Sequence, residues 1–395
     1  MSIEGALTIT LQRDEQAIQS VQIQSTRPLQ AARVFQQKSP SEVITLISLM
    51  YNICGIAQGR AAQLAFSQAL TRKQEPHLAQ LNNHLVLIET AREHLCRITF
   101  DWPDFLNEQA KQSGMAALIK QLNDIKRKLQ CYDVMTEISV STADIELELT
   151  EMIAKINGVL ETTIIGQSLE RWQELQDTTY LSRWINSTDT ITARLMQYIQ
   201  ATGWEDLGAN SVRPLPDLTT RDLNNYLTQD NADQFIAHPM HYEQCYETTP
   251  LARQQNAPLI IDCLKVYGNG LISRVVARVH ELVAIVDRLR TAAANRFRSD
   301  SIDNSSKLSL PSGVGIGQVD AARGHLVHRV ELENEKVKRY QILAPTEWNF
   351  HPDGVLTKAL MTLTGRDHKT LQQQAAMLIN AIDPCVGYQL RINDA

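Results

Sequence analysis

The stretch MYNICGIAQGRAAQLAF, residues 50–66, reads as an apolar helix that contains one cysteine, Cys54. Small residues follow this cysteine at short intervals: Gly55, Ala57, Gly59, Ala61 and Ala62. Gly55 and Gly59 are four positions apart, so they share one face of a helix. The space that they leave around Cys54 suits close packing against another backbone or a group bound at the thiol. Spacing alone favours packing.

Hydrophobic periodicity predicts the elements on either side of this helix. Alternating apolar residues indicate strands at ALTITLQ (6–12) and SVQIQS (20–25), joined by a polar turn. The SPSE motif at 39–42 is typical of a helix start, and we expect one helix from there through Phe66. Further helices are predicted at 77–98, 115–131, 144–173, 188–202 and 271–297.

The remaining elements lie toward the C-terminus. LVHRVEL and VKRYQIL predict a hairpin around ENEK, and 368–382 predicts a last helix that ends before Asp383-Pro384. We expect a long ordered loop at 204–255 and a flexible segment at 299–312. Short strands near both termini and many helices between them indicate an α+β, predominantly helical fold. We expect a single domain over residues 1–395.

Composition excludes some classes of function. The chain has 395 residues, of which 43% are hydrophobic, and a net charge of −6. This charge gives no sign of the basic surface that binds nucleic acid or an anionic membrane. It contains no run of apolar residues long enough for a transmembrane helix, and its start lacks the basic region of a signal peptide. Its six cysteines form no C-x-x-C pair and no disulfide framework. We expect a cytoplasmic protein with reduced thiols.

Motifs spread along the whole chain resemble those of the large subunit of nickel–iron hydrogenases. In order they are IEGALTI (3–9), NICGIAQGRA (52–61), ETTPLAR (247–253), AARGHLVH (321–328), APTEWNF (344–350) and DPCVGYQLR (383–391). Because six motifs occur in the family's order, the resemblance implies a hydrogenase large-subunit-like fold. Such a fold would bring Cys54 and Cys385 together.

The departures from the family's pattern bear on activity. In the family, two C-x-x-C motifs supply four thiolates to a nickel–iron centre. Here the first cysteine of each pair remains, as Cys54 and Cys385, and the second is replaced by Ala57 and Tyr388. Alanine has no ligand atom, and tyrosine is a poor substitute for a bridging thiolate at a soft-ligand site. We therefore expect no catalytic residue, no enzyme activity and no nickel.

This pattern is similar to that of HupK/HoxV-type hydrogenase maturation proteins. The resemblance implies a non-catalytic scaffold that holds iron as an Fe(CN)2(CO) fragment, transiently, between Cys54 and Cys385. The implied partners are a HypC-type chaperone, HypD and the apo large subunit that receives the fragment. Thiolates are soft ligands that suit such an iron, and two of them release it more easily than four.

The resemblance also places further residues in the pocket. Arg323 matches the arginine over the diatomic ligands, where a guanidinium can donate hydrogen bonds to cyanide. Glu4 matches a proton-passing glutamate, although a backbone hydrogen bond is the alternative. Tyr388 either closes the site or simply packs. The predicted pocket comprises Arg323, Glu4, Gly55, Ala57, Asp383, Pro384 and Tyr388.

Other interpretations remain open from the sequence. The two cysteines also suit structural thiols or a redox pair in a partner-binding large-subunit paralogue, or in a chaperone without metal. Arg253 either faces the site or forms a buried ion pair, and His325 and His328 favour structural roles. Small buried hydrophobic roles are expected for Cys96, Cys131 and Cys263.

Overall fold

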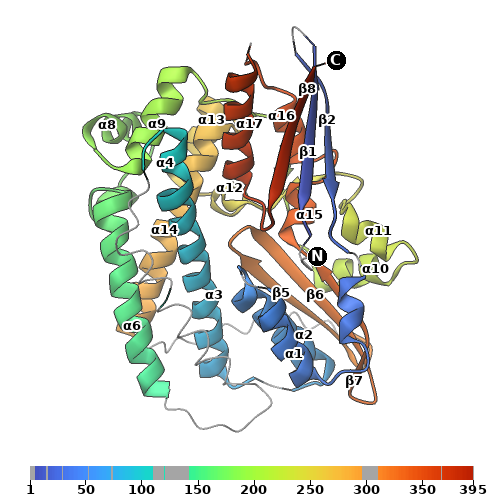
Figure 1. The fold of residues 1–395 in the computed structure, drawn as a ribbon. Helices are drawn as coiled ribbons and strands as arrows, with labels where there is room; N and C mark the ends of the chain where they lie inside the picture. Colours follow the sequence, from blue (N-terminus) through green and yellow to red (C-terminus); the bar gives the residue numbers. More distant parts are fainter. Residues whose placement is uncertain are drawn as a thin grey trace.

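The computed structural model describes residues 5–14, 17–28, 30–51, 53–72, 74–109, 120, 142–295, 310–365 and 367–394. Glu4, Cys131, most of the predicted helix at 115–131 and most of the segment at 299–312 lie outside these residues. Within the described part, helices form a layered body beside two three-stranded sheets, and two short strands form a further two-stranded one (Figure 1). None of the described helices is long and apolar enough to cross a membrane.

One sheet joins the two ends of the chain (Figure 1). Its central strand β1 (Leu7–Arg13) pairs antiparallel with β2 (Ile18–Ser25) and parallel with β8 (Tyr388–Asp394). The two predicted N-terminal strands are confirmed. The sequence did not reveal β8, because most of its side chains are polar and exposed and only its pairing with β1 makes it a strand. Its ladder begins directly after the Cys385 turn and so fixes that turn against β1.

The second sheet is an antiparallel meander in the order β5 (Val314–Ala321), β6 (Gly324–Glu333) and β7 (Lys336–Leu343). The predicted hairpin is the β6–β7 pair. Asn334 and Glu335 both adopt a positive φ, of 52° and 59°, as a two-residue type I′ turn requires. A second tight turn, between β5 and β6, carries Arg323.

Helix α2 (Gly55–Ala69) lies against β5 at backbone distance. A Cβ added at Gly317 would stand 2.0 Å from the Ala61 carbonyl oxygen, and one at Gly315 would stand 1.9 Å from that of Ala65. These glycines also hid β5 in the sequence, since glycine weakens the strand signal. The small residues of 50–66 therefore allow close packing of the helix on the strand, and the packing interpretation is confirmed for Ala61.

The prediction of one helix from 39 through Phe66 was wrong. The segment forms α1 (Pro40–Met50) and then α2, with a break that contains Cys54. The start of α1 is the expected capping box, in which Ser39 and Glu42 bond each other's backbone N–H. The second helix start is stabilised from outside the segment, since the Glu89 carboxylate accepts hydrogen bonds from its first free N–H groups.

Four other predicted helices are present, as α3 (Pro76–Cys96), α9 (Ile191–Thr202), α14 (Leu271–Ala294) and α17 (His368–Ile382). The segment 144–173 is interrupted after a π-helical turn, where Gly166 adopts a φ of 63°. The other helices are α4 (Trp102–Phe105), α6 (Thr142–Val159), α7 (Leu169–Gln173), α8 (Thr178–Ser187), α10 (Thr220–Thr228), α11 (Ala232–Ala237), α12 (Pro250–Gln254), α13 (Pro258–Tyr267), α15 (Pro345–Asn349) and α16 (Val355–Leu360).

The expected long loop at 204–255 was also wrong, because it contains α10, α11, α12 and the short strands β3 (Arg213–Pro214) and β4 (Tyr246–Glu247). Helix α14 packs against α3, α6 and α17 and is buried along most of its length. The α+β, mostly helical class is confirmed. The single domain stays a prediction.

Replacing Gly317 with alanine should destabilise the protein, because the new methyl group meets a helix carbonyl that cannot move independently. We expect a loss of about 1–3 kcal/mol in the free energy of unfolding, measured by urea denaturation. Gly59→Ala is the matched control on the facing helix, where no atom lies within 4 Å of the added Cβ. It should stabilise by about 0.5–1 kcal/mol, and equal effects of the two variants would contradict the close packing.

Candidate functional site

The fold brings together the two cysteines that the sequence singled out. Cys54 occupies the N-cap position of α2, and Cys385 follows the end of α17. Both thiols are free and both residues are partly exposed. Burial among protein atoms raises the pKa of the Cys54 thiol, and the nearby Cys385 raises it further. Cys385 therefore lies close enough to Cys54 to act on its thiol electrostatically.

A chain of hydrogen bonds holds the Cys54 side. The Gln58 Nε2 atom donates to Cys54 Sγ at 3.6 Å, and Gln58 Oε1 lies 2.7 Å from His328 Nε2. His328 Nδ1 lies 2.7 Å from the Tyr340 hydroxyl. Burial, with a contribution from Arg27, lowers the pKa of His328 to about 3, so the ring is neutral. His328 is therefore a strand histidine that positions Gln58.

The helix start beside Cys54 does not activate the thiol. A helix N-terminus ordinarily favours a thiolate because its free N–H groups carry partial positive charge. Here the Glu89 carboxylate accepts from the N–H groups of Ile56 and Ala57, at 2.9 Å each. This negative charge adds to burial and to Cys385 in raising the pKa of Cys54.

The surroundings of Cys385 differ from those of Cys54, but they also raise the pKa of the thiol. The Thr346 hydroxyl lies 2.8 Å from Cys385 Sγ. Burial raises the pKa of the Cys385 thiol, and Thr346, Arg323 and Arg27 offset this only in part. Arg27 itself pairs with Glu347, at 2.5 Å between Nη1 and Oε1. Both thiols are therefore neutral near pH 7 unless a cation lies between them.

Asp383 organises the turn that carries Cys385. It ends α17 in the left-handed region, with a φ of 67°, and its side chain is 2% exposed. Its Oδ1 lies 2.8 Å from Arg97 Nε and 3.3 Å from Arg323 Nε, and its Oδ2 lies 3.3 Å from Arg278 Nη1. Burial alone would raise the pKa of Asp383, but these guanidinium groups hold it at about 2.

Arg323 is fixed in the tight turn between β5 and β6. Its Nη1 atom donates to Glu93 at 2.7 Å, while its Nε faces Asp383. Gly324, which follows it, has a φ of 134°, and a Cβ there would stand 2.0 Å from Thr248 Oγ1. The turn therefore requires glycine after the arginine.

Arg253 forms a buried ion pair and also supports this turn. Its Nε and Nη2 atoms donate to the Glu281 carboxylate at 2.5 and 2.7 Å. Nη2 also donates to the Ala322 carbonyl at 3.1 Å. Of the two sequence interpretations of Arg253, the structure shows the ion pair.

The remaining predicted pocket residues lie at different depths. Gly55 and Ala57 are buried at the start of α2, directly after Cys54. The Pro384 carbonyl accepts from Arg97 Nη2 at 3.4 Å. Tyr388 is 41% exposed, and its charged neighbours are Arg97 and Asp101. It therefore lies toward the surface.

Two of the other cysteines test the buried hydrophobic role that the sequence predicted for them. Cys263 is fully buried, as expected, whereas Cys96 is only partly buried, so the expectation of a buried hydrophobic role was wrong there. Sequence reasoning missed several residues that line or hold the site. They are Arg27, Gln58, Glu89, Glu93, Arg97, Arg278, Thr346 and Glu347. Charged residues four positions apart in an apolar helix are the sequence signal that could have revealed the charged ones. Such residues are kept in a buried helix because a buried charge requires a partner of opposite charge.

The described residues offer few metal ligands at this site. Within the described ranges, no group of three or more His, Cys, Asp or Glu side chains is arranged to hold a metal ion. An ion at Cys54 and Cys385 would therefore receive two thiolates from the protein and would need its other ligands from elsewhere.

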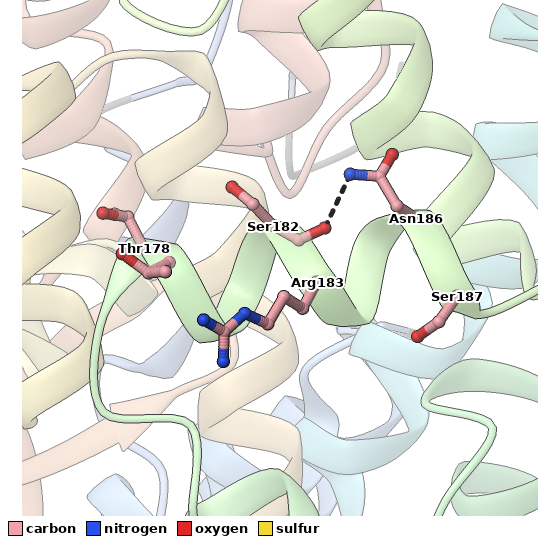
Figure 2. Close-up of a pocket in the computed structure, with 6 residues that line it drawn as sticks. Thr178, Ser182, Arg183, Asn186 and Ser187 are labelled. Atoms are coloured by element: carbon pink, nitrogen blue, oxygen red, sulfur yellow. Dashed lines mark hydrogen bonds between the residues drawn. The ribbon is translucent and has the colours of Figure 1, made fainter.

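A separate hollow of about 620 Å³ lies along one face of α8, shown in Figure 2. Its lining is mainly hydroxyl groups, and Asn186 donates to the Ser182 carbonyl at 2.9 Å within it. Arg183 stacks over Tyr180, 5.3 Å from the ring centroid. The hollow is formed by a single helix and includes none of the cysteine-site residues.

Comparison with known proteins shows the family of this chain. Residues 173–388 match the profile of nickel-dependent hydrogenases, which covers more than half of the chain. The chain belongs to the nickel-dependent hydrogenase family. In structure it resembles the Ni-Fe-Se hydrogenase of Desulfomicrobium baculatum in its reduced form, with a TM-score of 0.66 and 13% identity over 98% of this chain and 97% of that one.

Relatives that match this chain over nearly its full length are named as hydrogenase expression/formation proteins. The hydrogenase expression/formation protein HoxV of Cupriavidus necator is 28% identical, over 94% of this chain and 93% of its own. The hydrogenase expression/formation protein HupK of Rhizobium leguminosarum is 24% identical, over 95% of this chain and 93% of its own. Recognition of the family from six motifs and of the HupK/HoxV group within it is confirmed.

Replacing Asp383 with asparagine should strongly destabilise the protein, because it leaves buried guanidinium groups without their counter-charge. We expect a loss of about 3–5 kcal/mol in the free energy of unfolding, measured by urea denaturation. Asp394→Asn removes the carboxylate of an exposed pair with Arg13 and is the control, with little change expected. A small effect of Asp383→Asn would mean that the cluster does not hold the turn.

Stability should depend on acid pH through the same carboxyl group. Its pKa is lowered from 3.8 to about 2 in the folded protein, so its contribution is complete above about pH 4 and is lost as the pH falls toward 2. The difference in unfolding free energy between the native protein and Asp383→Asn should therefore shrink over this range. A difference that stays constant down to about pH 2.5 would contradict the lowered pKa.

Proposed function

We propose that this protein is a non-catalytic maturation scaffold for a nickel–iron hydrogenase. In this proposal it holds an Fe(CN)2(CO) fragment between Cys54 and Cys385 and passes it to the apo large subunit. The observation that carries the proposal is the pair of free thiols that a hydrogenase-type fold keeps together. The names of the similar HoxV and HupK proteins, which are expression/formation proteins, support the maturation role.

The chemistry of the thiol pair suits temporary holding. Two neutral thiols accept a soft cation by releasing protons, so binding and release are linked to proton transfer. The fragment is the cargo, and it brings three diatomic ligands of its own. This matches a site that offers only two protein thiolates in the described residues.

Arg323 is the residue proposed to seat the cyanide ligands. Glu93 and Asp383 engage its Nη1 and Nε atoms, and neither contact uses Nη2. A guanidinium oriented in this way can donate from Nη2 to a cyanide nitrogen while keeping its charge. Arg323 then acts as a positioning group for the cargo.

The lost ligands support a role without catalysis or nickel. Ala57 and Tyr388 stand where the family has its bridging cysteines, and Tyr388 is largely directed toward the surface. Two metals therefore cannot be bridged here as they are in the family's nickel–iron centre. A HypC-type chaperone, HypD and the apo large subunit are the partners that this proposal implies.

A second candidate is a partner-binding paralogue without metal. It is favoured by the hydrogen bonds that both thiols already have, to Gln58 and to Thr346. Arg323 also has two carboxylates as partners. A site satisfied in this way is stable without cargo, so the two candidates differ in whether iron ever binds.

Infrared spectroscopy with iron analysis, on protein purified without oxygen from its native host, tests the proposal. We expect cyanide and carbonyl stretching bands and about one iron per chain, because two thiolates hold one fragment. The variant with Cys54→Ala and Cys385→Ala should lose both.

Cys245→Ser is the matched control, since this cysteine contacts His351 and not the site. It should retain the bands. If native protein and the double variant are both free of iron and support hydrogenase activity equally, the metal-free candidate replaces the scaffold.

A further inference from the structure

A groove of about 500 Å³ runs between β7 and the chain that leads from β2 into the short helix η1 (Ala31–Phe35). Five consecutive residues of β7, 338–342, form one wall. Arg27 and Tyr51 also line it. The volume is in the range of pockets that bind ligands or short peptides. The groove is distinct from the thiol pair but adjoins it, because Arg27 influences the pKa of Cys385 and Cys54 influences that of Tyr51.

The wall formed by β7 is the free edge of a sheet. The strand order is β5-β6-β7, so β7 pairs with β6 on one side only. On its other side, Val337 exchanges hydrogen bonds with Gln37 and Lys38, at 2.8 and 3.0 Å. The register with β6 skips Lys338, which is a bulge residue.

Beyond the bulge, the outward backbone groups belong to Tyr340 and Ile342. In an antiparallel sheet, the residues of the central strand β6 direct their backbone N–H and C=O groups alternately to β5 and to β7. Those directed to β7 pair with Arg339, Gln341 and Leu343, so the β7 residues between these three face outward. No described residue forms a backbone hydrogen bond with Tyr340 or Ile342 on the open side. The groove therefore contains N–H and C=O groups that are spaced to receive another strand.

The charges in the groove define the strand that would fit. Arg33 and Arg339 line it and form no ion pair with any described residue. Asp233 also lines the groove and has no ion pair among the described residues. The other charged lining groups are already paired: Arg27 with Glu347, Glu331 with Arg329 and Lys338 with Glu333.

We propose that the free edge of β7 binds an extended acidic segment of a partner polypeptide as an added strand. Backbone hydrogen bonds with Tyr340 and Ile342 supply affinity, as in other cases of strand addition. Alternate side chains of the segment share a face with Arg339, and acidic residues there pair with it. The intervening side chains share the face of Tyr340 and Ile342, which is apolar, so alternating acidic and apolar residues fit best.

Docking here would bring a partner next to the thiol pair. Two residues that line the groove lie within electrostatic reach of the cysteines, Arg27 of Cys385 and Tyr51 of Cys54. The binding surface itself does not depend on iron. A role of this surface in transfer of the iron fragment rests on the function proposed above.

Fluorescence anisotropy with the labelled peptide EVEVE tests the strand addition. We expect saturable binding to the native protein, and none by the same peptide with N-methylated amides, which cannot donate to the strand edge. Arg33→Glu together with Arg339→Glu should weaken binding about tenfold or more, because both changes reverse an attractive charge. Arg183→Glu, at an exposed position of α8, is the matched control and should bind as the native protein does.

Equal binding of EVEVE and its N-methylated form would overturn the proposal, as would equal binding by the arginine double variant. The peptide should also bind unchanged to protein carrying Cys54→Ser and Cys385→Ser. This separates the groove from the iron proposal, since either one can fail while the other holds.

Discussion

The carboxylate of Asp383 binds three arginines from three separate parts of the chain, and the rest of the site depends on this buried cluster. Arg97 follows α3, Arg278 lies on α14, and Arg323 lies in the turn between β5 and β6. A charge buried at this depth is tolerated only when it is paired on several sides. The cluster therefore fixes the turn before Cys385 relative to two core helices and one sheet.

The second constraint is the close contact between α2 and β5. Without side chains at Gly315 and Gly317, the helix backbone can approach the strand and bring Cys54 toward the sheet. Glu89 of α3 then anchors the start of α2. The two cysteines thus approach from opposite ends of the chain, each held by a carboxylate that also contacts another element.

These constraints produce thiols that are positioned but neutral. Neither the helix start at Cys54 nor the arginines near Cys385 overcome burial, so the pKa of each thiol is raised. A site of this kind suits a group that arrives with its own charge and ligands. The groove at the β7 edge adds a route by which another polypeptide would reach the same region.

The sequence by itself determined the family, the two retained cysteines and most of the long helices, because motifs and hydrophobic periodicity are local properties. It also indicated the hairpin through its turn residues and the helix end at Asp383-Pro384. It missed the break between α1 and α2 that contains Cys54, strand β8 and strand β5. The first depends on Glu89, the second on pairing with β1, and the third on glycines that only a neighbouring helix explains.

Only the tertiary structure decided how the site is held. From the sequence, Asp383 was expected only as a pocket residue after the last helix, yet its carboxylate pairs with residues as distant in the chain as Arg97 and Arg278. Arg253 had two equal interpretations, and the position of Glu281 on α14 selected the ion pair. Such choices lie beyond sequence patterns because a buried charge selects its partner by distance in space, and that distance exists only after the chain has folded.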